Sequence, residues 1–141
     1  MTLSQCTFRT NSALRLLNVE SSSLQIANSL FDGADAKCAR VLYVNSARVE
    51  ITNSAFRRWQ TAPTSADDRL VDVVAATAAA LTRLTFSECN ALIGLAVRSG
   101  AVLVENCNFD RVAVSSVTGV QLPAALMLTP LGTRSAAVVR R

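Results

Sequence analysis

A short phrase of alternating apolar and polar residues recurs along the chain. LQIANSLF at 24–31, VEITNSAF at 49–56 and VLVENCNF at 102–109 match position by position, and weaker copies are MTLSQCTF at 1–8 and LTFSECNA at 84–91. The alternation in the first half of each copy predicts a short β-strand. The Asn-like residue that follows suits a corner, because asparagine tolerates the left-handed backbone conformation. Each copy therefore predicts a strand that ends in a bend.

The spacing of the copies predicts a repeat fold. They begin at residues 1, 24, 49, 84 and 102, and a second apolar stretch precedes each inner copy, such as VLYV at 41–44 and LVDVV at 70–74. Strands this short bury their apolar side when each one pairs in parallel with its copy in the next repeat. We therefore expect an all-β fold, a right-handed parallel β-helix (β-solenoid) of about five coils.

A leucine-rich repeat is the nearest competing fold. Its pattern places an asparagine three residues after the last leucine of the strand. In this chain Asn28 and Asn53 come only two residues after Ile26 and Ile51. That spacing favours the parallel β-helix.

The NSxF, NCxF and QCTF phrases resemble the right-handed parallel β-helix repeats of the pectin-lyase-like superfamily, including those of polymorphic outer-membrane and other surface proteins. The resemblance covers residues 1–111. Phe8 to Asn11 is similar to the FxxN of the polymorphic outer-membrane repeat, although the GGA-type tetrapeptide of that repeat is missing. The resemblance implies an extracellular or cell-surface location as part of a larger precursor.

Stacked copies place equivalent side chains in rows, with about 4.8 Å between neighbouring strands. We expect an aromatic row, a polar row and a row of small side chains that follow the polar one. Their members are Phe8, Phe31, Phe56 and Phe109, interrupted by Ala91; Asn28, Asn53 and Asn106, interrupted by Glu88; and Cys6, Ser29, Ser54, Cys89 and Cys107. Two aliphatic rows are Leu24, Val49, Leu84 and Val102, and Leu3, Ile26, Ile51, Phe86 and Val104.

The cysteines of the small-residue row allow two interpretations. Cys89 and Cys107 would lie one coil apart, within reach of a disulfide. Buried free thiols are the expectation, and a bridge between Cys89 and Cys107 is the alternative.

The amino-acid composition argues against several classes of function. Half of the 141 residues are apolar and 17% are charged, which suits one packed domain. The net charge is +4, but the basic residues are scattered without interleaved aromatics, which argues against nucleic-acid binding. The chain has no histidine, so it lacks the usual neutral-pH general base and most zinc ligand sets. We expect no enzyme, no metal and no cofactor.

The long step between the third and fourth copies carries an expected inserted loop at 57–70, RRWQTAPTSADDRL. A binding site there would use Trp59 as a stacking platform for a sugar, Arg57 and Arg58 to meet a carboxylate, and Asp67 and Asp68 as a cation site or acid pair. The alternative is that Trp59 covers the aromatic row while the charges solvate a surface loop.

The expected organisation is coils over 1–111, with 112–141 as an imperfect last coil, a cap or a frayed tail. Residue 1 already lies inside a repeat, so we expect a piece of a longer solenoid or an end that another chain covers. The expected function is a noncatalytic structural or surface-display segment, adhesin-like or a scaffold for contact with protein or glycan. Contact with a membrane is expected only through parts outside this chain, and copies can stack end to end. A carbohydrate-binding or polysaccharide-degrading protein, a lyase or glycosidase, is the alternative.

Overall fold

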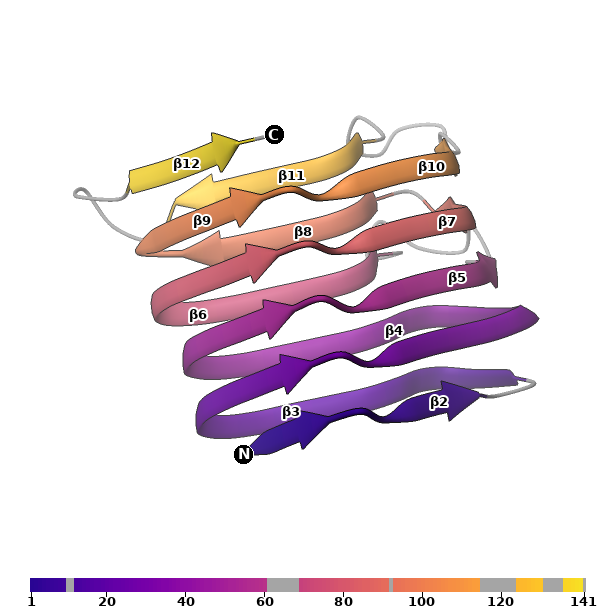
Figure 1. The fold of residues 1–141 in the computed structure, drawn as a ribbon, viewed down its shortest axis with the longest axis horizontal. Coiled ribbons are helices and arrows are strands. Elements are labelled where there is room, and N and C mark those ends of the chain that lie inside the picture. Colours follow the sequence, from indigo (N-terminus) through magenta and orange to yellow (C-terminus); the bar gives the residue numbers. More distant parts are fainter. Residues whose placement is uncertain (10–11, 61–68, 92, 115–123, 131–135, 141) are drawn as a thin grey trace.

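The computed structural model describes residues 1–9, 12–60, 69–91, 93–114, 124–130 and 136–140 (Figure 1). Within these ranges the regular elements are all strands, and every strand pairing is parallel. The prediction of an all-β fold with parallel pairing between repeats is confirmed. The strands are β1 (Thr2–Ser4), β2 (Thr7–Arg9), β3 (Ser12–Ala27), β4 (Leu30–Thr52), β5 (Ala55–Gln60), β6 (Arg69–Thr82), β7 (Thr85–Ala91), β8 (Ile93–Ser99), β9 (Ala101–Glu105), β10 (Asn108–Val114), β11 (Ala124–Pro130) and β12 (Ala136–Arg140).

The pairings fall into three columns of strands, each joined to the next by a corner. In Figure 1, β5, β7 and β10 lie in a nearer layer and β6, β8 and β11 in a more distant one. Residues in register in the first column are Leu3, Ile26, Ile51, Leu81, Val104 and Val139. Those in the second column are Phe8, Phe31, Phe56, Phe86 and Phe109, and those in the third are Leu17, Leu42, Val71, Leu95 and Leu126. This arrangement is compatible with a solenoid.

Left-handed backbone conformations mark two corners in the repeat. The first corner lies between the first and second columns, and the predicted bend at the asparagines is confirmed there. Its residues are Gln5, Asn28, Asn53, Arg83 and Asn106, with φ between 48° and 55°. The second corner, between the second and third columns, was not predicted. Its residues are Ala34, Arg58, Glu88 and Arg111, with φ between 47° and 55°.

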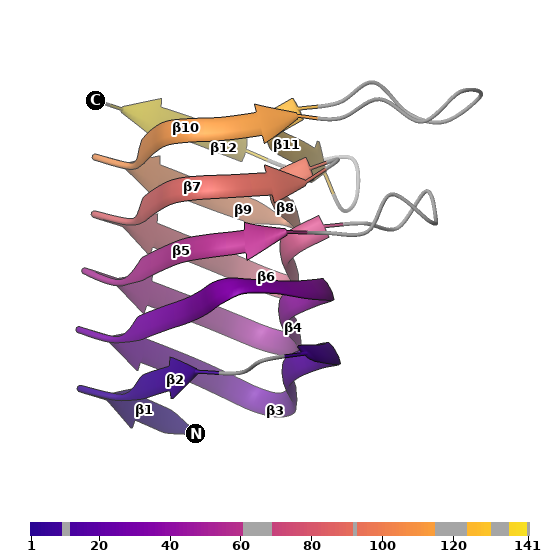
Figure 2. The ribbon, with the colours of Figure 1, turned by 90° about the vertical axis from the view of Figure 1, so that its right-hand side faces the viewer.

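The core lies between the columns and is built from stacked side chains. The side view in Figure 2 and the residue pairings between the strands both place β5, β7 and β10 one above the other. Their phenylalanine rings continue the stack of Phe8 and Phe31, with successive ring centroids 4.7, 4.6, 5.0 and 4.9 Å apart and planes within 10° of parallel. Repetition of one side chain at one position thus produces a continuous apolar interior.

The fourth copy of the repeat lies at 79–86, so its predicted position at 84–91 is wrong. Leu81 lies between Ile51 and Val104, and Phe86 lies between Phe56 and Phe109. The aromatic row is therefore not interrupted by Ala91. The reason is that stacking Phe86 on two other rings buries far more aromatic surface than stacking an alanine there. The two aliphatic rows are corrected accordingly: Ala79 replaces Leu84 in the first, and Leu81 replaces Phe86 in the second.

The inserted loop is shorter than predicted, because residues 57–60 belong to β5 and residues 69 and 70 to β6. Residues 61–68 lie outside the described part of the chain. Beyond residue 111, β10 continues to Val114, β11 pairs with β8, and β12 pairs with β9. The described residues between 112 and 141 therefore extend the same three columns of strands. No helix in the described ranges has the length and apolar character needed to cross a membrane.

Candidate functional site

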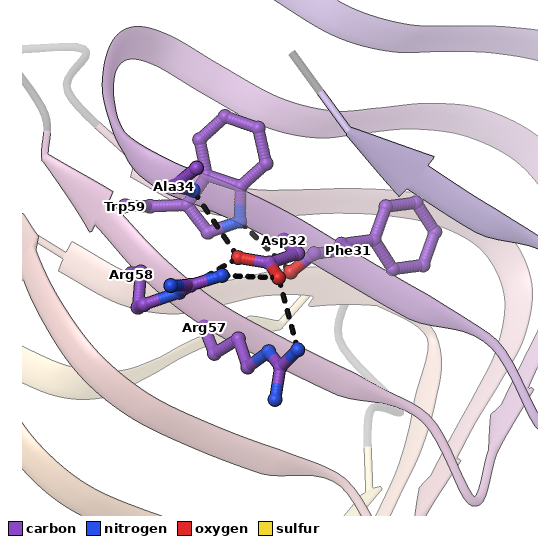
Figure 3. A network of polar contacts seen from close by, with 6 residues as sticks. All are labelled: Phe31, Asp32, Ala34, Arg57, Arg58 and Trp59. Carbon is purple, nitrogen blue, oxygen red and sulfur yellow. Dashed lines mark hydrogen bonds and ion pairs between the residues drawn. The ribbon is translucent and has the colours of Figure 1, made fainter. Parts of the chain in front are cut away.

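The predicted arginines meet a buried aspartate on the neighbouring strand. Asp32 follows Phe31 in β4, and Arg57 lies in register with Asp32 on β5. Arg58 occupies the second corner directly after Arg57, and its left-handed φ of 55° turns the chain there. Two consecutive arginines can therefore approach one carboxylate (Figure 3).

Asp32 is saturated with hydrogen bonds. Arg58 donates from Nε to Oδ1 at 2.9 Å and from Nη2 to Oδ2 at 2.6 Å, and Arg57 Nη2 donates to Oδ2 at 2.9 Å. The Ala34 backbone N–H donates to Oδ1 at 3.1 Å. The Asp32 side chain has no exposed surface, whereas the Arg57 and Arg58 side chains are 42% and 39% exposed. The carboxylate is thus enclosed and the guanidinium groups reach solvent.

These contacts decide the charge of Asp32. The hydrogen bonds from Arg58 hold the pKa of the Asp32 carboxyl well below its usual range, and the Ala34 N–H and Arg57 act in the same direction. Burial opposes them by raising the pKa, but its effect is smaller than their sum. Asp32 is therefore ionised at neutral pH and is a structural anion rather than a general acid or base.

Trp59 cannot stack on a sugar, so its predicted role as a binding platform is wrong. Its side chain has no exposed surface and belongs to the same core cluster as Phe31 and Phe56. The indole Nε1–H donates to the Phe31 carbonyl oxygen at 3.0 Å. Gly33 makes room for the ring, because a Cβ at residue 33 would lie 2.6 Å from Trp59 Cδ2. Trp59 packs the interior beside the second corner.

Asp67 and Asp68, the predicted cation site or acid pair, lie outside the described residues. That role stays a prediction. Among the residues that the structure does describe, no group of three or more acidic or cysteine side chains gathers in a way that could hold a metal ion.

A second arginine cluster was not found from the sequence. Asp72 in β6 has no exposed side-chain surface and pairs with Arg69 at 3.2 Å and with Arg98 at 3.2 Å, and Arg40 Nη1 lies 3.9 Å from it. Arg40 also lies over the Tyr43 ring, 5.4 Å from its centroid. The available signal was a carboxylate inside the apolar strand LVDVV, since a buried charge has to be paired.

The predicted polar row is present at the first corner, with one replacement. Asn53 Nδ2 donates to Asn28 Oδ1 at 2.6 Å. Arg83, and not Glu88, occupies the equivalent corner of the fourth copy. Glu88 lies at the second corner, where it pairs with Arg111 at 2.8 Å. Amides therefore occupy the first corner in four of the five copies, whereas the second corner holds Ala34 and three charged residues.

Cys89 does not belong to the small-residue row, because the fourth copy places Leu84 there. Cys89 lies in register with Val112, and its Sγ donates to the Ser87 carbonyl at 3.2 Å. Cys6, Cys89 and Cys107 are all free, so the alternative of a Cys89 to Cys107 bridge is wrong. Burial raises the pKa of the Cys89 and Cys107 thiols, which keeps them protonated and unreactive at neutral pH.

The small hydroxyls of the same row are satisfied by backbone groups. Ser29 Oγ donates to Ala27 O at 2.9 Å and accepts from the Cys6 N–H at 3.3 Å. Ser54 Oγ repeats the pattern with Thr52 O at 2.9 Å and the Ser29 N–H at 3.1 Å. Each hydroxyl thereby links two successive repeats and is not an activated nucleophile.

Comparison with protein-family models, with curated proteins and with solved structures finds no match to this chain. Its function is therefore argued from its own residues.

Proposed function

We propose that the chain is a noncatalytic structural segment of the right-handed parallel β-helix type. The observation that carries the proposal is the continuity of its side-chain rows: five phenylalanine rings stack at 4.6 to 5.0 Å through all five repeats. A right-handed winding is expected because a right-twisted strand that returns in parallel to the same sheet does so in that hand.

The arrangement of charges supports a scaffold rather than an active site. The two carboxylates that are fully buried among the described residues, Asp32 and Asp72, accept hydrogen bonds from two arginines each. A general base needs a lone pair that faces a substrate, and a nucleophile needs an adjacent base. Asp32 and Asp72 instead neutralise arginines on neighbouring strands, and so contribute to holding the repeats in register.

Partner and location form part of the same proposal and rest on the resemblance of the repeats. A rigid stack that presents its outer faces to protein or glycan at a cell surface fits the pectin-lyase-like resemblance. Stacking of copies end to end belongs to this proposal too, since β1 and β2 each pair with one strand only among the strands that the structure describes.

An activity screen tests the noncatalytic part of the proposal. Purified protein is incubated with neutral and acidic polysaccharides, and lyase products are measured by ultraviolet absorbance and hydrolase products as new reducing ends. We expect no turnover above a Phe56→Ala control, which has a damaged core. Turnover that is lost in Asp72→Asn, while that variant keeps the wild-type circular dichroism spectrum, would overturn the proposal.

A further inference from the structure

The first corner carries a polar groove of about 290 Å³. Its lining includes the corner residues Asn28, Asn53 and Arg83, with Thr85 beside them, and none of the described residues that line it is acidic. We call it the Arg83 groove. It is separate from the Asp32 and Asp72 clusters, whose residues do not line it.

Arg83 occupies a corner position that holds asparagine in three of the five copies and glutamine in the first. Its φ of 54° matches those of Asn28, Asn53 and Asn106, and its N–H donates to the Glu105 carbonyl at 2.9 Å as the Asn53 N–H does to Thr82. Asparagine adopts this backbone conformation far more readily than arginine does. Arg83 therefore holds the corner at a cost in backbone strain, as do Gln5 at the same corner and the second-corner residues Ala34, Arg58, Glu88 and Arg111.

The left-handed backbone at residue 83 belongs to the corner, as it does in the other copies. The Arg83 side chain is exposed, and it forms no ion pair with any described acidic residue. The Arg83 guanidinium is therefore available to an anion in the groove.

The other groups in the groove define the chemistry of that ligand. Asn28 Oδ1 already accepts a hydrogen bond from Asn53, which leaves the two N–H donors of the Asn28 amino group available. The Ser29 and Ser54 hydroxyls are engaged with Ala27 and Thr52. The groove thus offers a guanidinium fork and an amide donor without a competing carboxylate.

We propose that the Arg83 groove binds an oxyanion, the carboxylate, phosphate or sulfate group of a small ligand. Arg83 pairs with two of its oxygens in the bidentate geometry of guanidinium groups, and the Asn28 amino group donates to the same group. The size of the groove suits the charged head of a ligand rather than a whole drug-sized molecule.

A titration followed by NMR tests the proposal. Acetate, inorganic phosphate and sulfate are added separately to ¹⁵N-labelled full-length protein at constant ionic strength, with chloride as the reference. We expect saturable amide shifts centred on residues 28, 53, 83 and 85 with at least one of the three anions. The anion that binds most tightly distinguishes a carboxylate ligand from a phosphate or sulfate ligand.

The decisive variant is Arg83→Asn, with Arg48→Asn as the matched control, since Arg48 is exposed and lies outside the groove. Both remove one positive charge. We expect Arg83→Asn to weaken anion binding at least tenfold and to unfold at a higher urea concentration than wild type, because asparagine relieves the corner. Arg48→Asn should bind like wild type.

Three results would overturn the proposal. One is the absence of saturable shifts with all three anions, and another is equal weakening in both variants. The third is a lower unfolding midpoint in Arg83→Asn, because Arg83 would then stabilise the fold and would not be held at a cost.

Discussion

At the scale of single residues, the left-handed corners select which side chains the repeat accepts. Asn28, Asn53 and Asn106 occupy the first corner with φ between 48° and 53°. Most L-residues pay about 1–2 kcal/mol to adopt this conformation, and asparagine pays less. The amide also bonds to its neighbour one repeat away, as Asn53 does to Asn28 at 2.6 Å. One residue type therefore shapes the bend and links the layers.

Replacing Asn53 separates these two contributions. Asn53→Ala is expected to lower the free energy of unfolding by roughly 1–2 kcal/mol, from backbone strain and the lost amide bond. Asn53→Gly keeps the conformation easily accessible and should lose less. Urea unfolding of both variants measures the difference. A glycine variant less stable than the alanine variant would show that strain at the corner is not the main term.

The Asp32 cluster predicts a pH dependence of stability. Because the folded-state pKa of Asp32 is depressed, its ionised form stabilises the fold above the unfolded pKa near 3.9, and this stabilisation is lost as the pH falls toward the folded-state value. Asp32→Asn should cost about 1–3 kcal/mol at pH 7, a range reduced because both arginines are partly exposed.

The test compares urea midpoints of wild type and Asp32→Asn between pH 7 and pH 2. The gap between them should stay constant above about pH 5 and narrow below it. Glu20→Gln, at an exposed position, serves as the control and should show no such trend. A gap that keeps its full size down to pH 2 would contradict the role given to the Asp32 carboxylate.

At the scale of the elements, stability is concentrated in the middle of the phenylalanine row. Phe31, Phe56 and Phe86 are completely buried between two rings each, whereas Phe8 is half-buried at the edge of the stack. Burial of an aromatic ring on both faces removes the most surface from water. Neighbouring strands are thus joined more strongly at β4, β5 and β7 than at β2.

Truncating the row at two places tests this gradient. Phe56→Ala should cost about 3–5 kcal/mol, the usual range for a core phenylalanine, and Phe8→Ala should cost less than half as much. Phe56→Leu, which refills most of the volume, is the control and should retain most of the stability. The free energies come from chemical unfolding. Equal losses at Phe8 and Phe56 would contradict a continuous stack with an exposed end.

At the scale of the whole molecule, the sequence correctly predicts the class of fold but places the fourth copy of the repeat in the wrong register. The copies at 24–31, 49–56 and 102–109 share both apolar positions, the asparagine and the phenylalanine, so their alignment is correct. Between residues 79 and 91 two overlapping alternations fit the strand pattern, and only the stacking of Phe86 on Phe56 decides between them. The pattern of residues 79–91 alone does not reveal this contact, because Phe56 lies thirty residues before Phe86 in the sequence.

The polar clusters show a similar limit. The residues of the second corner, Ala34, Arg58, Glu88 and Arg111, share no side-chain chemistry, so no repeating letter marks them. Arg57 and Arg58 were selected as candidates, but their partner Asp32 becomes adjacent only through the parallel pairing of β4 and β5. The sequence pattern places Trp59 in a predicted loop, whereas in the structure Trp59 belongs to β5 and its side chain is buried in the core. Burial of a lone aromatic depends on register and not on its neighbours in sequence.

The central claim is that five repeats stack in parallel in the register set by the phenylalanine row. Nuclear Overhauser contacts between selectively labelled phenylalanine rings test it most directly. We expect contacts from Phe86 to both Phe56 and Phe109, whose ring centroids lie 5.0 and 4.9 Å away. Contacts from both Phe56 and Phe109 to the methyl group of Ala91, with none to Phe86, would contradict the register and with it the continuous core on which the proposed scaffold function rests.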